Sequence, residues 1–172
     1  MSTPAVRIEE QDHICTIIID RPHKKNAVDR PTAEALYAAF EHFEADANLR
    51  VAVLWGANGT FCSGADLTAM HDPETRNSID PEGKEYGPMG PTRMALSKPV
   101  IAAISGYAVA GGLELSLLCD LRAVTGNSIT ETGRGMCELQ QATDRQPREI
   151  DAVIDPFETQ SWIVWGLKSV KS

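Results

Sequence analysis

A glycine pair followed closely by a glutamate, Gly111-Gly112-Leu113-Glu114, is the part of this sequence best suited to chemistry. The pair stands between an apolar run and an apolar helical segment, so the first amides of that helix have no intrahelical acceptor. Such amides stabilise negative charge, because the helix dipole lies behind them. Glycine has no Cβ, so we expect a flat carbonyl group to approach the backbone here closely enough to accept a hydrogen bond. Glu114 would lie beside that carbonyl.

A second corner of the chain supplies another backbone donor. Residues 49–67 read LRVAVLWGANGTFCSGADL, in which a β-branched strand leads through a turn-rich segment to a Ser-Gly-Ala-Asp corner. The amide of Ala65 in that corner would converge with the amide of Gly111. Two such donors can hold the oxygen of an acyl thioester as it becomes an enolate, and losing one donor of this kind costs about 3 kcal/mol.

Four motifs in register carry a resemblance to a known family. They are Asp20-Arg21-Pro22 with Asn26-Ala27, then residues 61–67, residues 98–104, and residues 106–115 with Cys119-Asp120. Through these motifs the chain, over residues 5 to about 125, resembles the enoyl-CoA hydratase/isomerase (crotonase) superfamily. The resemblance implies an α/β fold of the crotonase-like ββα-repeat (spiral) type, carboxy-terminally incomplete in this chain.

The same resemblance implies a lyase of enoyl-CoA hydratase type, which adds water to a 2-enoyl-CoA. The amides of Ala65 and Gly111 would form the oxyanion hole for the thioester enolate, and Glu114 would hold or deprotonate the water. Taken alone, Glu114 could also be a solvated acid that the helix dipole favours in a first turn. Coenzyme A thioester enters as substrate, no cofactor is implied, and the family assembles as a homotrimer or hexamer.

Two loops are expected to bind coenzyme A. By resemblance, the contacts come from Lys24, Lys25, Ala27, Ala65, Asp66 and Leu67. Lys24 and Lys25 belong to a run with Arg21 and His23 that places four potentially cationic side chains within five residues, which suits phosphate groups. Two simpler interpretations stay open, in which the run is a solvated turn and Asp66 caps the helix that follows it.

The family pattern stops after Val124. Most hydratases of the family carry a second catalytic carboxylate about twenty residues beyond the first, but Arg134 stands at that distance from Glu114. Glu131 and Glu138 lie nearby, and neither is flanked by the family's pattern. The sequence therefore assigns only one catalytic carboxylate.

This departure leads to a prediction of domain organisation and to a second hypothesis. We expect a crotonase-like core over residues 1–125 and an atypical, poorly ordered tail over residues 126–172, the truncated, alternatively spliced or frame-shifted end of a longer protein. Without the family's carboxy-terminal third, the pocket would be open and one sheet face uncovered. The chain would then be a catalytically inactive isoform that binds acyl-CoA or a protein partner.

The elements that must position these residues follow from hydrophobic periodicity. Branched residues predict a hairpin of strands over residues 6–10 and 14–19. Residues 31–46 are typical of an amphipathic helix capped by Asp29. A strand over residues 51–55 would complete a βαβ unit. Further along, we expect a mobile loop over 70–90, a helix over 91–97, a strand over 99–104, a helix over 113–119 and a strand over 121–124.

Composition narrows the class of protein. A chain of 172 residues with 42% hydrophobic and 23% charged residues fits one globular domain. Its formal charge of −8 argues against nucleic acid or an anionic membrane as partner, and no apolar run reaches the length of a membrane span.

Motifs of other classes are missing from the sequence. The four cysteines show neither metal-ligand nor C-x-x-C spacing. Neither Gly-x-Ser-x-Gly nor Gly-x-Gly-x-x-Gly occurs at the places that a serine hydrolase or a dinucleotide enzyme would require. The first ten residues are typical of neither a signal peptide nor a mitochondrial leader, so we expect a cytoplasmic location, with mitochondria as the alternative.

Overall fold

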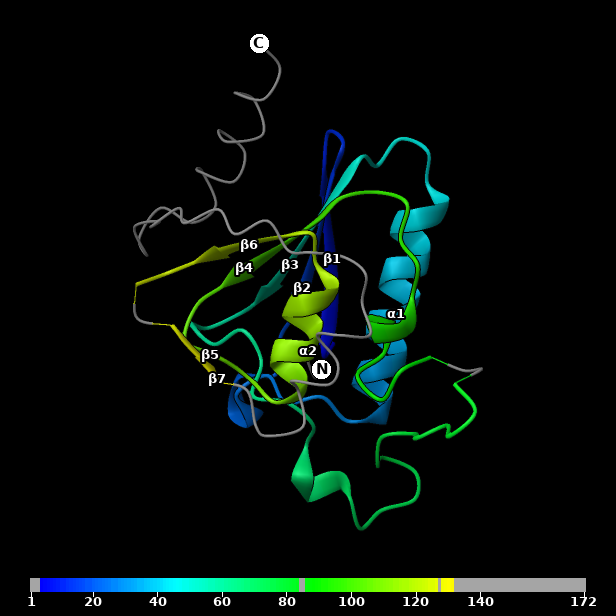
Figure 1. Ribbon diagram of the computed structural model, residues 1–172, viewed down its shortest axis with the longest axis vertical. Coiled ribbons are helices and arrows are strands. Elements are labelled where there is room, and N and C mark those ends of the chain that lie inside the picture. Colours follow the sequence, from blue (N-terminus) through cyan, green and yellow to red (C-terminus); the bar gives the residue numbers. More distant parts are fainter. Residues whose placement is uncertain (1–3, 84–85, 127, 132–172) are drawn as a thin grey trace.

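A five-stranded sheet in the order β1-β2-β3-β4-β6 is the centre of the fold (Figure 1). The computed structural model describes residues 4–83, 86–126 and 128–131. The strands of this sheet are β1 (Val6–Gln11), β2 (Ile14–Ile19), β3 (Val51–Gly56), β4 (Val100–Ile104) and β6 (Leu121–Val124). The pair β1 and β2 is antiparallel, and every other neighbouring pair is parallel. The predicted hairpin and the three predicted later strands are therefore confirmed to within one residue.

Helix α1 (Arg30–Ala45) connects the parallel strands β2 and β3, which confirms the predicted helix and the βαβ unit. At its start the carboxylate of Asp29 accepts a hydrogen bond from the amide of Thr32 at 3.0 Å, as the predicted cap requires. At its end the Lys98 ammonium donates to two backbone carbonyl oxygens, at 2.7 and 2.6 Å. Both ends of the helix thus have partners for groups that the helix itself leaves unpaired.

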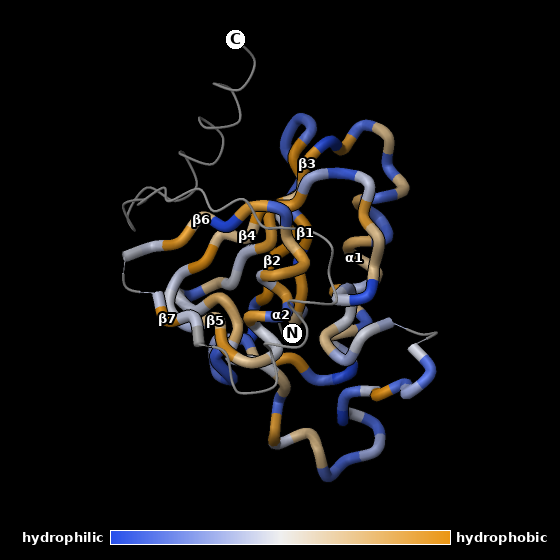
Figure 2. Tube along the Cα trace, in the orientation of Figure 1, coloured by the Kyte–Doolittle hydropathy of each residue, from blue (hydrophilic) through white to orange (hydrophobic). Residues whose placement is uncertain are grey.

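The apolar core lies where α1 and the later helix α2 (Gly111–Leu118) meet the sheet. Figure 2 shows the central strands as largely hydrophobic, whereas the loop that leaves the sheet at the bottom of the view is largely hydrophilic. The largest fully buried side chains of the core include Ile17, Ile19, Leu36, Phe40, Phe43, Leu54, Phe61, Met89, Ile104 and Leu115. These residues come from every layer of the described fold, so the core holds α1, α2 and the sheet together.

The segment before α2 contains a short strand that periodicity did not predict. Strand β5 (Tyr107–Val109) pairs in parallel with β7 (Ile129–Glu131) in a separate two-stranded sheet. Three residues are too few to show an alternating pattern. Between β5 and α2, Ala110 has φ +50° and ψ −124°, a conformation that costs a residue with a Cβ about 1–3 kcal/mol. This turn lets α2 begin at Gly111, two residues earlier than predicted.

The loop over residues 70–90 is irregular in its described part, as predicted. It is nevertheless tied down, because the side-chain amide of Asn77 donates to the carbonyl oxygens of Pro88 at 2.7 Å and Val28 at 3.1 Å. The predicted helix over residues 91–97 is wrong, since only a single 3-10 turn, Pro91–Arg93, forms. The amide of Ser97 instead donates to the Glu44 carboxylate on α1 at 3.0 Å, and the chain bends at Ser97 and Lys98 before it enters β4.

Most of the predicted tail over residues 126–172 lies outside the described residues, including Arg134 and Glu138. Strand β7 falls within that segment, and its pairing with β5 places it beside the core. The division of the chain near residue 125 stays a prediction. Among the described residues, no helix is both long and apolar enough to pass through a membrane.

Gly112 in α2 generates a prediction about stability. A Cβ at this position would lie 2.1 Å from the carbonyl oxygen of Cys62 and 2.8 Å from its carbonyl carbon, and neither backbone atom can rotate away. We expect Gly112→Ala to lower the free energy of unfolding by about 2–3 kcal/mol, although alanine has the higher helix propensity. Urea denaturation followed by circular dichroism measures the loss. Gly126→Ala is the control, because its Cβ would meet nothing within 4 Å; equal losses in both variants would contradict this packing.

Candidate active site

Two segments far apart in the sequence run side by side at the amino end of α2. Three backbone hydrogen bonds of 2.7, 2.8 and 3.2 Å join them, from Phe61 N to Ser105 O, from Cys62 N to Tyr107 O and from Val109 N to Cys62 O. The corner that follows Cys62 therefore runs alongside β5 and reaches the start of the helix. The unpredicted strand is thus part of what brings the two predicted corners together.

Gly64 lies directly against the first residues of α2. A Cβ at Gly64 would lie 3.1 Å from the Cβ of Ala110 and 3.3 Å from the backbone nitrogen of Gly111. Gly64 also has φ +98°, a conformation that residues with a Cβ rarely adopt. Because Ala65 follows Gly64 directly, the two amides predicted as donors belong to backbone segments in near contact.

Neither predicted donor has an acceptor within the described residues. Gly111 is the first residue of α2, so its N–H has no intrahelical partner. On either side of Ala65, the carbonyl of Gly64 accepts from the Val28 amide and the Asp66 amide donates to the Val28 carbonyl, both at 2.8 Å. The Gly64 carbonyl and the Ala65 N–H belong to one trans peptide and point in opposite directions, so the N–H of Ala65 points away from Val28. Ala65 is exposed, so this corner lies at the surface of the protein.

Glu114 is a half-buried acid in the first turn of α2. It follows Gly111 by three residues, which places both on one helix face about 4.5 Å apart along the axis. Within the described part of the chain, its carboxylate has no hydrogen-bond or ion-pair partner. Burial raises the pKa of this carboxyl. An acid without a partner, one helical turn from the unpaired amide of Gly111, can take up or release a proton during a reaction.

The two glycines of α2 have a different role from the predicted one. The sequence suggested that a substrate carbonyl uses the space left by their missing side chains. A Cβ at Gly111 would instead lie 2.5 Å from the sulfur of Met89, and a Cβ at Gly112 would meet the backbone of Cys62. Protein atoms therefore fill both spaces. The glycines allow α2 to pack closely against its neighbours, and this close packing sets the position of the Gly111 amide.

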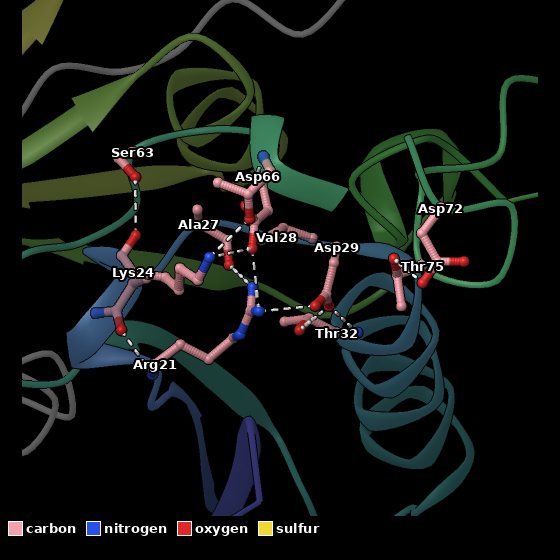
Figure 3. Close-up of polar contacts among 12 residues, drawn as sticks. Arg21, Lys24, Ala27, Val28, Asp29, Thr32, Ser63, Asp66, Asp72 and Thr75 are labelled. Atoms are coloured by element: carbon pink, nitrogen blue, oxygen red, sulfur yellow. Dashed lines mark hydrogen bonds and ion pairs between the residues drawn. The ribbon is translucent and has the colours of Figure 1, made fainter. Parts of the chain in front are cut away.

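The cationic loop contributes one internal residue, Arg21 (Figure 3). Its guanidinium is 2.7 Å from a carboxylate oxygen of Asp29 and 3.2 Å from one of Asp66, and it also donates to the carbonyl of Ala27. Burial raises the pKa of Asp66, but hydrogen bonds from Thr68 and the charges of Lys24 and Arg21 outweigh this effect, so that the pKa lies below its usual value. The Asp66 carboxylate is therefore a charged internal group.

The residues predicted to bind coenzyme A divide into internal and outward ones. Asp66 accepts from the Thr68 amide at 3.0 Å and so caps the 3-10 turn Leu67–Ala69, which confirms the simpler interpretation of this side chain. Ala27 is buried, and its carbonyl is used by Arg21. Lys24 is half-buried, with its ammonium 2.6 Å from the Thr68 hydroxyl, whereas Lys25 and Leu67 are exposed. Of the six predicted residues, Lys24, Lys25 and Leu67 thus have side chains that can meet a ligand, and Ala65 is exposed as well.

Asn26 is a structural residue that sequence reasoning matched to the family but gave no role. It is fully buried, and its side chain accepts from the Arg21 amide at 2.8 Å and donates to the carbonyls of Ala57 at 2.9 Å and Thr60 at 2.6 Å. The available signal in the sequence was the residue type, because asparagine tolerates the φ of +56° found here better than most residues do. Asn26 therefore fixes the first loop against the segment that enters the second.

Neither a metal-ligand group nor a reactive thiol occurs at this site within the described residues. No group of three or more metal-ligating side chains occurs among them. Cys62 is buried beside Gly64, and burial raises the pKa of its thiol to about 12, so it is not a thiolate nucleophile near neutral pH. Cys137 lies outside the described residues, as does the side chain of Glu131.

Glu114 generates a prediction about pH and stability. Because its pKa is raised on folding, the folded protein holds this proton more tightly than the unfolded chain does. The resulting stabilisation is complete below the ordinary value of 4.5 and is lost as the pH rises through the raised pKa. We therefore expect Glu114→Gln to exceed the wild type in free energy of unfolding near neutral pH and to lose that advantage in acid, as measured by urea denaturation across pH.

Glu41→Gln, at an exposed acid on α1, is the control for the loss of one carboxylate from the protein. A Glu114→Gln variant that is less stable than the wild type near neutral pH would contradict the assignment of a desolvated carboxylate.

The chain is similar in sequence to known proteins of one family. The model of the enoyl-CoA hydratase/isomerase family matches residues 9–152, beyond Val124 where the sequence motifs end. The chain is 33% identical over 153 residues to (E)-benzylidenesuccinyl-CoA hydratase of Thauera aromatica. The matched region covers 87% of this chain and 59% of that protein. The chain is also 32% identical over 139 residues to mevalonyl-coenzyme A hydratase of Aspergillus fumigatus, covering 79% and 51%.

Solved structures agree with the sequence comparisons. A crystal structure of an enoyl-CoA hydratase from Mycobacterium tuberculosis H37Rv superposes with a TM-score of 0.69 and 37% identity, covering 81% of this chain and 51% of that one. The chain thus spans between half and three fifths of the length of these relatives. The predicted fold class is confirmed, and the chain belongs to the enoyl-CoA hydratase/isomerase family, with the crotonase fold.

Proposed function

We propose that this chain carries the acyl-CoA site of an enoyl-CoA hydratase-type lyase, which adds water to the double bond of a 2-enoyl-CoA. The observation that carries the proposal is the contact between Gly64 and the start of α2, which brings together two backbone segments whose amides lack acceptors. The thioester oxygen would accept from the N–H groups of Ala65 and Gly111. Two donors at one oxygen draw electrons from the conjugated double bond and stabilise the enolate that forms when its β-carbon is attacked.

Glu114 would act on the water. Its carboxylate, one helical turn from the Gly111 amide, takes a proton from water while the hydroxyl oxygen bonds to the β-carbon. The electron pair of the double bond moves to the thioester oxygen, and as the carbonyl forms again Glu114 returns its proton to the α-carbon of the enolate. All atoms of the water thus end in the product, Glu114 is again a carboxylate, and the step needs no cofactor.

The names of the relatives support the substrate class, since those compared above are hydratases of CoA esters. We propose that Lys24 and Lys25 contact the phosphates of coenzyme A and that the exposed backbone after Asp66 contacts the adenine. On the basis of the sequence alone, we also propose a cytoplasmic location.

Replacement of the acid tests the proposed chemistry. We expect Glu114→Gln to lower the rate of crotonyl-CoA hydration by about 10²-fold or more, because glutamine cannot accept the proton. The assay follows loss of the ultraviolet absorbance of the enoyl thioester. Glu41→Gln, an exposed acid on α1, should retain wild-type turnover. Undiminished hydration by Glu114→Gln would remove Glu114 from the mechanism.

Isothermal titration with butyryl-CoA, run beside that assay, separates the proposed enzyme from an inactive binding isoform. The proposal predicts both binding and hydration by the wild-type chain. Binding without any hydration would support the isoform, and the absence of both would contradict an acyl-CoA site altogether.

The phosphate contact has a test of its own. We expect Lys24→Gln to weaken binding of butyryl-CoA about tenfold, which is typical for loss of one charge-assisted hydrogen bond. Binding of butyryl-pantetheine, which lacks the nucleotide, should not change. Arg50→Gln, which removes another exposed cation, controls for net charge. Equal weakening with both ligands would mean that Lys24 shapes the loop and does not meet phosphate.

A further inference from the structure

We infer that Arg21 is a positioning residue that holds the Ala65 amide in its donating orientation. The inference deepens the proposed function and rests on it, because the Ala65 amide matters only if it meets an acyl oxygen. Arg21 lies on the protein side of the corner and would not touch the substrate.

The Ala65 peptide depends on its neighbours for its orientation. Its own N–H has no acceptor in the described residues, so no hydrogen bond fixes the direction in which that group points. The orientation is set by the bonds on either side, which join Gly64 and Asp66 to the backbone of Val28, each at 2.8 Å. Any shift of Asp66 relative to Val28 therefore rotates the peptide between them.

The side chain of Arg21 fixes the position of Asp66 relative to Val28 (Figure 3). Its guanidinium contacts the Asp66 carboxylate at 3.2 Å and donates to the carbonyl of Ala27, the residue before Val28. The same nitrogen that meets Asp66 lies 2.7 Å from the carboxylate of Asp29, which caps α1. The planar fork of arginine thus joins the corner, the first loop and the start of a long helix.

Burial makes this junction sensitive to loss of the arginine. The side chains of Arg21, Asp29 and Asp66 are only 12%, 14% and 5% exposed. Removing the guanidinium would leave two poorly solvated carboxylates facing the same space, and an uncompensated buried charge is strongly unfavourable. Lys24 cannot replace it, because its ammonium is 3.7 Å from Asp66 and is already used by Thr68. We therefore expect Asp66 to move, and the Ala65 amide with it.

The test compares Arg21→Met with Arg7→Met in the full chain. Arg7 is a matched control, since it also pairs with two carboxylates, those of Glu9 and Asp20, but lies on β1 and contacts no residue of the corner. Hydrogen exchange at the Val28 and Asp66 amides measures how firmly the corner is held, and it does not require catalytic activity. Hydration kinetics and titration with butyryl-CoA report its consequences.

We expect exchange at the Val28 and Asp66 amides to rise about tenfold or more in Arg21→Met, with strands β2 and β3 unchanged. The kcat for hydration should fall about 10²-fold, as for a misplaced oxyanion donor, while the dissociation constant of butyryl-CoA changes less than about threefold. Arg21→Lys should recover part of the rate, because a single ammonium can meet one carboxylate but cannot span both. Arg7→Met should leave all these quantities near wild type.

Unchanged exchange at Val28 and Asp66 in Arg21→Met would overturn the inference, as would equal changes in Arg7→Met or a loosened corner with full kcat. A merely structural role would lower folded protein and stability but leave the kcat of the folded fraction intact. A wild-type chain that binds no CoA thioester and hydrates none would instead overturn the proposed function, and the exchange data would still decide whether Arg21 holds the corner.

Discussion

The close approach of the backbone at Gly64 to the start of α2 is the constraint on which the rest of the site depends. Charge on an acyl oxygen can be stabilised by backbone amides only if two of them reach the same point, and here they come from segments widely separated in sequence. The segment that ends at Gly64 is held at one end by two hydrogen bonds between Cys62 and strand β5 and by one from Phe61 to Ser105 just before that strand. Its other end is held by the first loop through Val28. The site is thus built from main-chain groups, whose positions follow from the packing of whole elements.

Several residues adopt unfavourable backbone angles or leave no space for a larger side chain, and this makes the close approach possible. Ala110 adopts a positive φ before α2, Gly64 adopts another, and Gly112 leaves no space for a Cβ beside Cys62. Buried Asn26 and largely buried Arg21 lose hydration on folding, and this cost is offset because each has several polar partners. These departures from ordinary preferences gather around the two amides and the half-buried Glu114, as expected where a fold positions reactive groups.

Local sequence signals predicted the regular elements well. Branched strands, the amphipathic period of α1 and the Asp29 cap each depend on neighbours in sequence, and the structure confirms them. The resemblance of four motifs predicted the family and the pair of corners. Strand β5 was missed because three residues are too few to show a hydrophobic period. The predicted helix over residues 91–97 does not form, because Ser97 contacts Glu44 on α1 instead. The roles of Arg21 and the glycines depend on atoms distant in sequence, so no local pattern contains them.

Nuclear magnetic resonance of the amides tests the central claim most directly. In a titration of the ¹⁵N-labelled chain with butyryl-CoA, the account predicts that the Ala65 and Gly111 N–H resonances both move downfield, with one common dissociation constant, as both begin to donate to the same oxygen. Binding reported elsewhere in the chain, with only one of these resonances or neither responding, would contradict a shared acceptor and with it the proposed site.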